Sequence, residues 1–192
     1  MAISKKLTKQ LNDVEKLIVK EGEKWLDIVM CSTIIVMWRY YGWRTDRISK
    51  LIKYHEAVWN EVGADNSKSV LKLLDEECDI ELTNHEGVSY RNVIFLNSDI
   101  DDGRMLTPYQ WLYMRTNQIK WLETQITGSI ALAIHRKEGW GFKRIKELLI
   151  HLQNVKYEFN YDRRRILDAC YEETGYDWEG RTQIQTESDE NA

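Results

Sequence analysis

The chain has 192 residues and a mass of 22.9 kDa, enough to bury a hydrophobic core that needs no disulfides. Its 43% hydrophobic and 30% charged residues exclude the disordered, collagen-like and membrane-spanning classes, and one proline with ten glycines disfavours an all-β fold with many turns. Because the net charge is −4, the molecule as a whole has no general attraction to nucleic acid or to an anionic membrane, so either kind of binding requires a local patch.

The cysteines and the apolar runs bear on where the protein works. Cys31, Cys78 and Cys170 are odd in number and widely spaced, which disfavours a secreted disulfide framework and favours a reducing cytosol. No signal peptide is visible in residues 1–20, and the longest apolar run, residues 25–38, has the length of a buried helix rather than a membrane span. We therefore expect a cytoplasmic protein with no membrane partner.

Apolar spacing predicts helices through the first half of the chain. They are expected over residues 4–19, 25–41, 48–58 and 66–77. The second of these ends before Gly42, a residue suited to the left-handed conformation that closes helices, and the fourth begins at Asn66, a good N-cap residue.

The pattern changes between residues 80 and 96. Ile80 and Leu82 precede the turn sequence Asn-His-Glu-Gly at 84–87, and β-branched and aromatic residues follow it up to Leu96. This arrangement predicts a short β-hairpin. We expect a polar loop over residues 97–104 after it.

The second half predicts the same order of helices. They are expected over residues 108–117, 121–138, 142–155 and 162–173. Thr107 before Pro108 is the usual order of an N-cap and a first helical residue, and Asp162 is a good N-cap residue for the last helix. Gly139 and Gly175 stand where left-handed caps are needed. Residues 181–192 are expected to form an acidic, frayed tail.

The two halves also match in sequence, which predicts an internal duplication. The segment KWLD at residues 24–27 recurs 96 residues later as KWLE, and Gly42-Trp43 recurs 97 residues later as Gly139-Trp140. We therefore expect a mainly α fold made of a duplicated helical-bundle unit with pseudo-twofold symmetry. The expected parts are a first repeat (1–78), a β-hairpin and loop connector (79–104), a second repeat (105–180) and the flexible tail (181–192).

Basic residues cluster after the two Gly-Trp turns and at the start of the last helix. The turns resemble that of a helix-turn-helix, in which the second helix enters the DNA major groove. That motif needs a small residue four positions before the glycine, where Trp38 and His135 stand here, so a plain helical hairpin with a solvated outer face is the alternative. The candidates for contacting nucleic acid or a partner are Arg44, Arg47, Lys143, Arg144, Arg163, Arg164 and Arg165.

Acidic and aromatic residues form two further groups. An acidic surface can occupy the nucleic-acid channel of another protein by imitating phosphates, and plain solubility is the alternative. The acidic candidates are Asp75, Glu76, Glu77, Asp99, Asp101 and Asp102. Four tryptophans recur in matching pairs and are assigned to the core, which leaves Trp38, Trp59, Trp111 and Trp178 as the interface candidates.

Motifs of known enzyme classes are missing from the sequence. It has no glycine-rich phosphate loop, no HExxH, no GxSxG and no CxxC. The four histidines are isolated, and His55 and His151 fall on or beside apolar helix faces, where a structural role is expected. We therefore expect no catalysis, no cofactor and no metal.

The segment from Ile130 to Ile145 resembles a motif in small helical proteins of Firmicutes phages and other mobile elements. It has an apolar helix that ends in Ala-Ile-His-Arg, an aromatic-glycine turn and a basic helix start. The first copy departs from it, with Trp38-Arg39 for the His-Arg pair and Arg44 for the second glycine. The resemblance implies a mobile-element origin in a bacterial host more than it implies a function.

Two classes of function fit these observations. The first is a non-enzymatic inhibitor of a host defence nuclease, of the anti-CRISPR kind that blocks DNA recognition by a Cas9-type effector, with the nuclease or its nucleoprotein complex as the partner. The alternative is a helix-turn-helix-like regulatory or packaging protein that binds DNA directly. Homo-oligomerisation stays open, because an internal duplication can present two similar surfaces.

Overall fold

A computed structural model describes residues 5–64, 69–92 and 107–178. Within these ranges the chain forms helices and no β-strand, so the expectation of a mainly α fold is confirmed. The elements are α1 (Lys5–Tyr41), α2 (Thr45–Ala64), α3 (Val70–Cys78), the short 3-10 turn η1 (Tyr90–Asn92), α4 (Pro108–Ile119), α5 (Leu122–Glu138), α6 (Phe142–Glu158) and α7 (Arg163–Thr174).

Helix α1 is continuous over 37 residues, where the sequence predicted two helices with a break between residues 19 and 25. Gly22 lies in the predicted gap but does not interrupt the helix. A single glycine inside a helix costs only about 1 kcal/mol relative to alanine, whereas the chain has no proline there to remove a hydrogen bond. The C-terminal part of α1 is the most deeply buried segment of the first half, since residues 28–37 are all buried.

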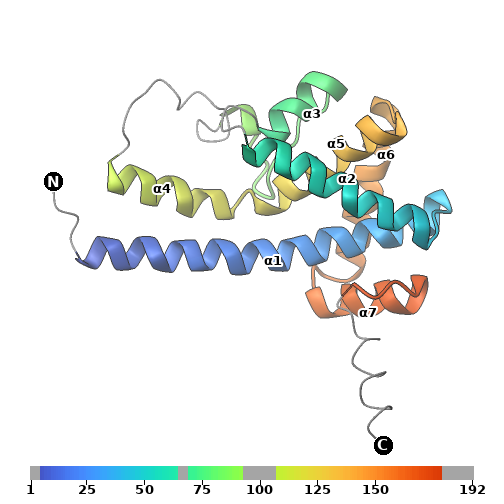
Figure 1. The fold of residues 1–192 in the computed structure, drawn as a ribbon, viewed down its shortest axis with the longest axis horizontal. Coiled ribbons are helices and arrows are strands. Elements are labelled where there is room, and N and C mark those ends of the chain that lie inside the picture. The colour runs from blue at the N-terminus through green and yellow to red at the C-terminus, as the bar shows by residue number, and fades with distance from the viewer. Residues whose placement is uncertain (1–4, 65–68, 93–106, 179–192) are drawn as a thin grey trace, which may run out of the picture.

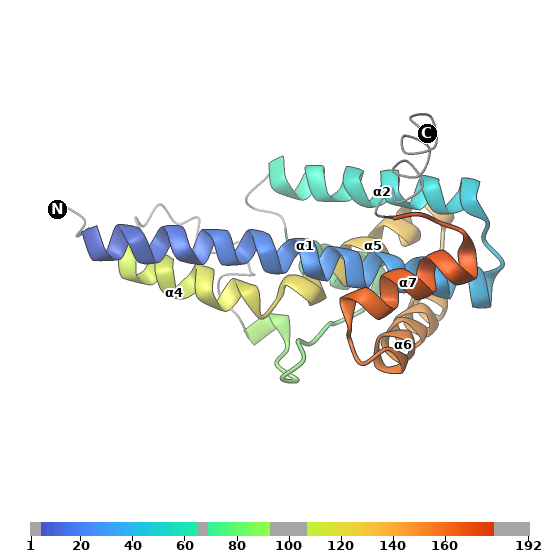
Figure 2. The same cartoon turned by 90° about the horizontal axis from the view of Figure 1, so that it is seen from below.

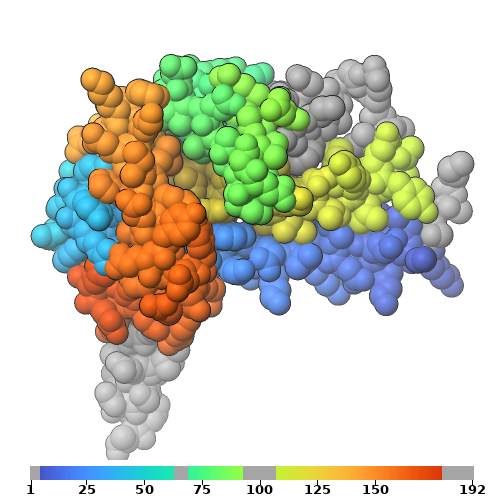
Figure 3. Space-filling view, turned by 180° about the vertical axis from the view of Figure 1, so that it is seen from behind, coloured from blue at the N-terminus to red at the C-terminus, as the bar shows by residue number. Residues whose placement is uncertain are grey.

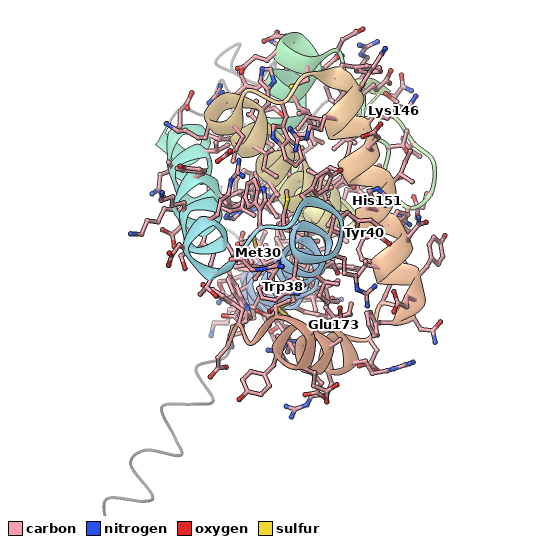
Figure 4. The ribbon with its side chains drawn as sticks, turned by 90° about the vertical axis from the view of Figure 1, so that its right-hand side faces the viewer. Met30, Trp38, Tyr40, Lys146, His151 and Glu173 are labelled. Carbon is pink, nitrogen blue, oxygen red and sulfur yellow. The ribbon has the colours of Figure 1, made fainter. Side chains whose placement is uncertain are left out.

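Helices from the two halves of the chain pack across one another. Figure 4 looks along α1 and shows α2, α6 and α7 around it. Helix α1 contacts α5, α6 and α7, while α5 also contacts α2 and α3 (Figures 1 and 2). The central core therefore combines residues 28–37 of α1 with residues 130–134 of α5, and it is covered by helices from both halves.

The helix order alone does not support the predicted internal repeat. One helix, α1, stands in the first half where the second half has two, α4 and α5, separated at Lys120 and Trp121. The helices of residues 1–78 and 105–180 also interleave, where two side-by-side bundles were expected. The repeat thus remains an interpretation of the sequence, and we return to it as a proposal.

The predicted β-hairpin connector is not supported. In the described residues 79–92, Thr83 and Ser89 form an isolated antiparallel bridge and no ladder extends from it. The side chain of Asn84 closes the turn instead, because its Oδ1 accepts hydrogen bonds from the backbone N–H groups of Glu86 and Val88, both at 3.0 Å. Two isolated strands are marginal in water, and this segment is held by packing of Tyr90 against the helices. Residues 93–104 of the predicted connector fall outside the described residues.

Several predicted helix ends are confirmed. Thr107 and Gln110 form a capping box ahead of Pro108, and the side chain of Asp162 accepts a hydrogen bond from the backbone N–H of Arg165 at 3.0 Å. Gly139 and Gly175 close α5 and α7 with φ angles of 66° and 68°, in the left-handed region. The predicted N-cap Asn66 and the tail at 181–192 lie outside the described residues.

Residues 5–22 of α1 and helix α4 lie side by side and project from the rest of the protein (Figures 1 and 3). We call this pair of segments the arm. An ion pair joins its two helices, with Nε of Arg115 2.8 Å from Oε1 of Glu15. Burial in the arm is slight, because α4 has no buried residue and Leu7 alone is buried among the described residues 5–22.

The described helices include none with the length and hydropathy needed to cross a membrane. All three cysteines lie within the described residues; they are buried, and none of them forms a disulfide. Burial raises the pKa of the Cys78 thiol to about 11, so this thiol is protonated at neutral pH and is a poor nucleophile.

Candidate functional site

The two Gly-Trp turns meet in the core. The rings of Trp43 and Trp140 lie edge to face with centroids 5.9 Å apart, and each residue is buried. Nδ1 of His135 lies 2.8 Å from the carbonyl oxygen of Trp140, which ties the end of α5 to its own turn. Contact between the two turns brings the N-termini of α2 and α6 to one end of the molecule.

Four of the seven predicted basic residues gather at this junction. The turn surface, as we name it, consists of Arg44, Arg47, Lys143 and Arg144. The guanidinium groups of all three arginines stack on indole rings, at 4.1 Å for Arg44 on Trp38, 4.3 Å for Arg47 on Trp43 and 3.9 Å for Arg144 on Trp140. Arg47 also pairs with Glu138. These arginines therefore stabilise the junction, because a stacked guanidinium gains a cation–π attraction as well as packing.

The other three basic candidates lie elsewhere, at the start of α7. Arg163 pairs with Asp27 of α1 at 2.6 Å, and Arg164 pairs with Asp168 of its own helix at 3.2 Å. Arg165 donates its backbone N–H to the Asp162 cap. The structure thus uses this basic run to start α7 and to dock it against α1.

Two arginine–carboxylate clusters hold the interleaved helices together. Arg39 of α1 donates from Nε to Glu173 at 2.6 Å and from Nη1 to Glu158 at 2.8 Å. Arg136 of α5 donates from Nε to Glu77 at 2.9 Å and from Nη1 to Glu61 at 2.8 Å. Arg39 therefore joins α1 to α6 and α7 of the second half, and Arg136 joins α5 to α2 and α3 of the first half. Figure 4 places Glu173 on α7, below α1.

These clusters change the acidity of their members. Hydrogen bonding to Glu173 and Glu158 raises the pKa of Arg39, and the equivalent bonds raise the pKa of Arg136. The hydrogen bond from Arg136 lowers the pKa of Glu77, and that from Arg39 lowers the pKa of Glu158. Both carboxylates consequently stay charged to lower pH than in an unfolded chain.

Two of the three described residues of the predicted acidic surface are paired within the molecule. Asp75 accepts hydrogen bonds from Nε of Arg91 at 2.9 Å, from Nη2 of Arg91 at 2.7 Å and from the hydroxyl of Tyr90. Burial alone would raise the pKa of Asp75, but these hydrogen bonds outweigh it and lower the pKa. Glu77 belongs to the Arg136 cluster, and Glu76 is exposed. Asp99, Asp101 and Asp102 lie outside the described residues.

The predicted interface tryptophans separate into three places. Trp38 lies beneath Arg44 at the turn surface, and Trp111 lies on the arm with 40% of its area exposed. Trp59 and Trp178 come together at a cavity of about 450 Å³, which we call the apolar cavity. Its walls come from α1, α2, α5 and the segment after α7.

A second cavity, of about 360 Å³, lies between α5, α6 and the 82–87 segment. We call it the polar cavity. Lys156, only 3% exposed, lines it and pairs with Glu123. Gln153 donates to the hydroxyl of Tyr161, and the buried hydroxyl of Thr127 finds no hydrogen-bond partner within the described part of the chain.

Sequence reasoning missed both cavities. The pair formed by Glu123 and Lys156 joins positions 33 residues apart on two helices, and the walls of the apolar cavity come from four segments. A helical pattern marks Lys156 only as a charge near an apolar face, so the sequence carried no sign of its burial.

The described residues give no indication of a metal centre. They contain no group of three or more His, Cys, Asp or Glu side chains arranged to hold a metal ion. His151 stacks on Tyr40 with ring centroids 3.9 Å apart, as Figure 4 shows from the end of α1. Comparison with protein-family models, with curated proteins and with solved structures finds no match to this chain.

Proposed function

We propose that this protein acts by binding a macromolecular partner and that the arm makes the contact. The observation that carries the proposal is the exposure of aromatic side chains on α4, a helix with no buried residue. Tyr109 is 69% exposed, Tyr113 is 71% exposed and Trp111 is 40% exposed. A helix that buries so little is stabilised when a partner covers it.

The composition of the arm supports a protein partner. Tyrosine, tryptophan and arginine dominate the residues that contribute most to protein–protein binding. Tyr109 and Tyr113 are four residues apart and therefore lie on one face of α4. Leu17 and Val19 of α1 add exposed apolar area in the same arm. Helix pairs of this kind present a preformed face to a groove on another protein.

Within this class we propose a non-enzymatic inhibitor from a mobile element, acting on a defence nuclease of its bacterial host. The absence of enzyme motifs in the sequence and the resemblance of residues 130–145 to phage proteins support this narrower statement. Such an inhibitor needs neither cofactor nor metal, since it works by covering the DNA-recognition surface of the nuclease.

A pull-down from nuclease-treated bacterial lysate tests the arm. The variant Tyr109→Ser/Tyr113→Ser removes two rings that are mostly exposed, so the fold should persist while the partner is lost. The matched control is Ile150→Ser/Tyr171→Ser, which removes two exposed apolar side chains from α6 and α7. Retention of the partner by the control alone supports the proposal, and equal retention by both variants contradicts it.

The narrower statement has its own test. A purified Cas9-type effector with guide RNA is incubated with target DNA, with and without the protein. We expect wild type to suppress cleavage and the arm variant to leave cleavage unaffected. Full cleavage in the presence of wild type would contradict inhibition of this nuclease class and leave the arm to be assigned by the pull-down.

Direct DNA binding is the second candidate, favoured by the gathering of four basic residues at the turn surface. Paired helix-turn-helix motifs read half-sites about 34 Å apart, whereas the two turns here touch through Trp43 and Trp140. The mode to test is therefore binding of the turn surface to the phosphate backbone of DNA at one place. A gel shift at two salt concentrations should show binding that weakens steeply with salt and is lost in Arg44→Ala/Lys143→Ala/Arg144→Ala. The matched control is Arg163→Ala/Arg164→Ala/Arg165→Ala.

We also infer that the chain arose by duplication of a helical unit. Arg39 and Arg136 are 97 positions apart, and their partners Glu158 and Glu61 keep the same spacing. The two clusters repeat the same donor atoms, with Nε directed to one carboxylate and Nη1 to the other. Matching bonds at matching positions support a common origin, in which each unit placed its arginine against the helices of the other.

A further inference from the structure

We propose that the apolar cavity is a binding site for a neutral, planar aromatic molecule with a single hydrogen-bonding group. The site borders the arm only at Gly22, and it is independent of the function proposed above. Its volume of about 450 Å³ lies within the range of small-molecule sites, and all its walls are helices except for Trp178 in the segment after α7.

The walls of the cavity favour an uncharged, flat ligand. Leu26, Ile52, Leu122 and Ile126 provide aliphatic surface, and the indoles of Trp59 and Trp178 provide two aromatic surfaces. The Trp178 ring is fixed, because its Nε1 donates to Asp27 at 2.7 Å. None of the described lining residues is a lysine or an arginine, and Glu56 lines the cavity as well. The carboxylate of Glu56 would therefore repel an anionic ligand, and no basic side chain of the lining would offset the repulsion.

His55 is the buried polar group of the site. It is 7% exposed, it lines the cavity, and its buried Nε2 has no hydrogen-bond partner among the residues that the structure describes. Burial lowers the pKa of this imidazole to about 4, so the ring is neutral at physiological pH. A buried nitrogen without a partner is costly, and a ligand carrying one donor or acceptor relieves that cost. Stacking of His55 on Trp59, with centroids 5.9 Å apart, orients the ring.

Gly22 gives the cavity an opening in its α1 wall. It lies inside a long helix, where glycine is less favourable than alanine. A Cβ at this position would meet no atom within 4 Å, so close packing of the protein does not require glycine here. Because Gly22 lines the cavity, the missing side chain leaves room for a ligand to approach the backbone.

Helix α6 supports the view that packing does not require a histidine at position 55. The residue 97 positions later, Leu152 of α6, is also buried, at 1% exposed. An aliphatic side chain therefore packs well at the position of α6 that matches His55 of α2 in sequence spacing. The imidazole at position 55 adds a polar group to a site whose surroundings are apolar, which is the arrangement of a ligand site.

Fluorescence titration with N-phenyl-naphthylamine tests the proposal on the full chain. This neutral dye has two aromatic groups and one N–H donor, and we expect saturable binding to one site. Gly22→Leu should fill the cavity and weaken binding at least tenfold. His55→Leu should weaken it about fivefold by removing one hydrogen bond. The matched control Glu23→Leu adds the same side chain at the next, exposed position of α1 and should bind as wild type does.

A charged analogue completes the test. Anilinonaphthalene sulfonate has the same rings with a sulfonate, and we expect it to bind at least tenfold more weakly than the neutral dye. Absence of saturable dye binding to wild type, equal binding by wild type and Gly22→Leu, or tighter binding of the sulfonate would each overturn the proposal. Circular dichroism of every variant establishes that it is folded, and Trp59→Ala, which truncates a partly exposed ring, serves if Gly22→Leu does not fold.

Discussion

The apolar cavity is lined by α2 and the polar cavity by α6, at positions of equal sequence spacing, but the two cavities differ in chemistry. Four pairs of lining residues stand 97 positions apart, with those of α2 in one cavity and those of α6 in the other. The pairs are Ile52 and Leu149, Glu56 and Gln153, Trp59 and Lys156, and Asn60 and Tyr157. Where α2 presents a half-exposed indole, α6 presents a buried ammonium group paired with Glu123.

The difference teaches that the helix scaffold tolerates opposite linings. Ile52 in the apolar cavity and Leu149 in the polar cavity are both aliphatic, so the two walls pack alike at this position. Trp59 and Lys156 differ in charge, and this difference sets the polarity of each wall. In the polar cavity a fixed charge pair occupies the wall, and in the apolar cavity the wall offers flat surface. The residues that carry specificity are therefore separable from those that hold the helices, and substitutions can test that separation.

The largest expected effect comes from breaking the buried ion pair. Lys156→Ala leaves Glu123 without its partner and should lower the free energy of unfolding by about 3–5 kcal/mol. Trp59→Ala, at the corresponding place in the apolar cavity, should cost only about 1 kcal/mol because Trp59 is partly exposed. Urea unfolding measures both. Equal losses would show that the two walls do not differ in the way described.

The second largest expected effect is a pH dependence of stability that comes from His55 of the apolar cavity. The pKa of His55 is about 4 in the folded state against 6.5 in a model peptide, so the unfolded chain takes up the proton first as the pH falls. The contribution of neutral His55 to the free energy of unfolding is complete above pH 6.5. It is lost as the pH falls from 6.5 to 4, by about 3 kcal/mol in total. His55→Leu, which introduces the residue type of position 152, should lack this decline. Unfolding curves of both proteins at several pH values in this range provide the measurement, and parallel pH dependences would argue against a buried neutral imidazole.

The smallest expected effects come from two glycines, with opposite signs. Gly22→Ala should raise the free energy of unfolding by about 0.5–1 kcal/mol, because alanine favours the helix and its Cβ meets no atom within 4 Å. Gly128→Ala should lower it by about 1–2 kcal/mol, because its Cβ would lie 2.8 Å from Cδ2 of the buried Leu71. Thermal unfolding of the two variants measures the signs. A loss of stability in Gly22→Ala would mean that the α1 wall is more tightly filled than the structure shows.

The local features of the fold were predictable from sequence because they depend on neighbouring residues. Thr107 with Pro108, Asp162 and Gly139 each determine a helix end within a few positions, and all three are where the sequence placed them. The continuity of α1 through Gly22 was missed, because a glycine weakens a helix without ending it. The connector was missed because its apolar residues pack on helices that a local pattern does not identify.

The candidate site was less predictable, because charges find partners across the fold. The sequence identified Arg163 and Glu77 as exposed candidates, yet Arg163 pairs with Asp27 and Glu77 pairs with Arg136. Only the turn surface was assembled largely from residues chosen in advance, since the matching Gly-Trp turns already indicated equivalent positions. Trp59 and Trp178 were chosen as partner contacts, and their meeting at a cavity depends on the return of the chain after α7.

The interleaving of helices has a consequence for synthesis on the ribosome. Residues 28–37 of α1 are made early, but they are covered by α5, α6 and α7, and α7 is made more than a hundred residues later. Until then, an apolar helix of the nascent chain has no native cover and is open to chaperones and to aggregation. Folding should therefore be largely post-translational and slow for a helical protein, because its core requires contacts between distant parts of the chain.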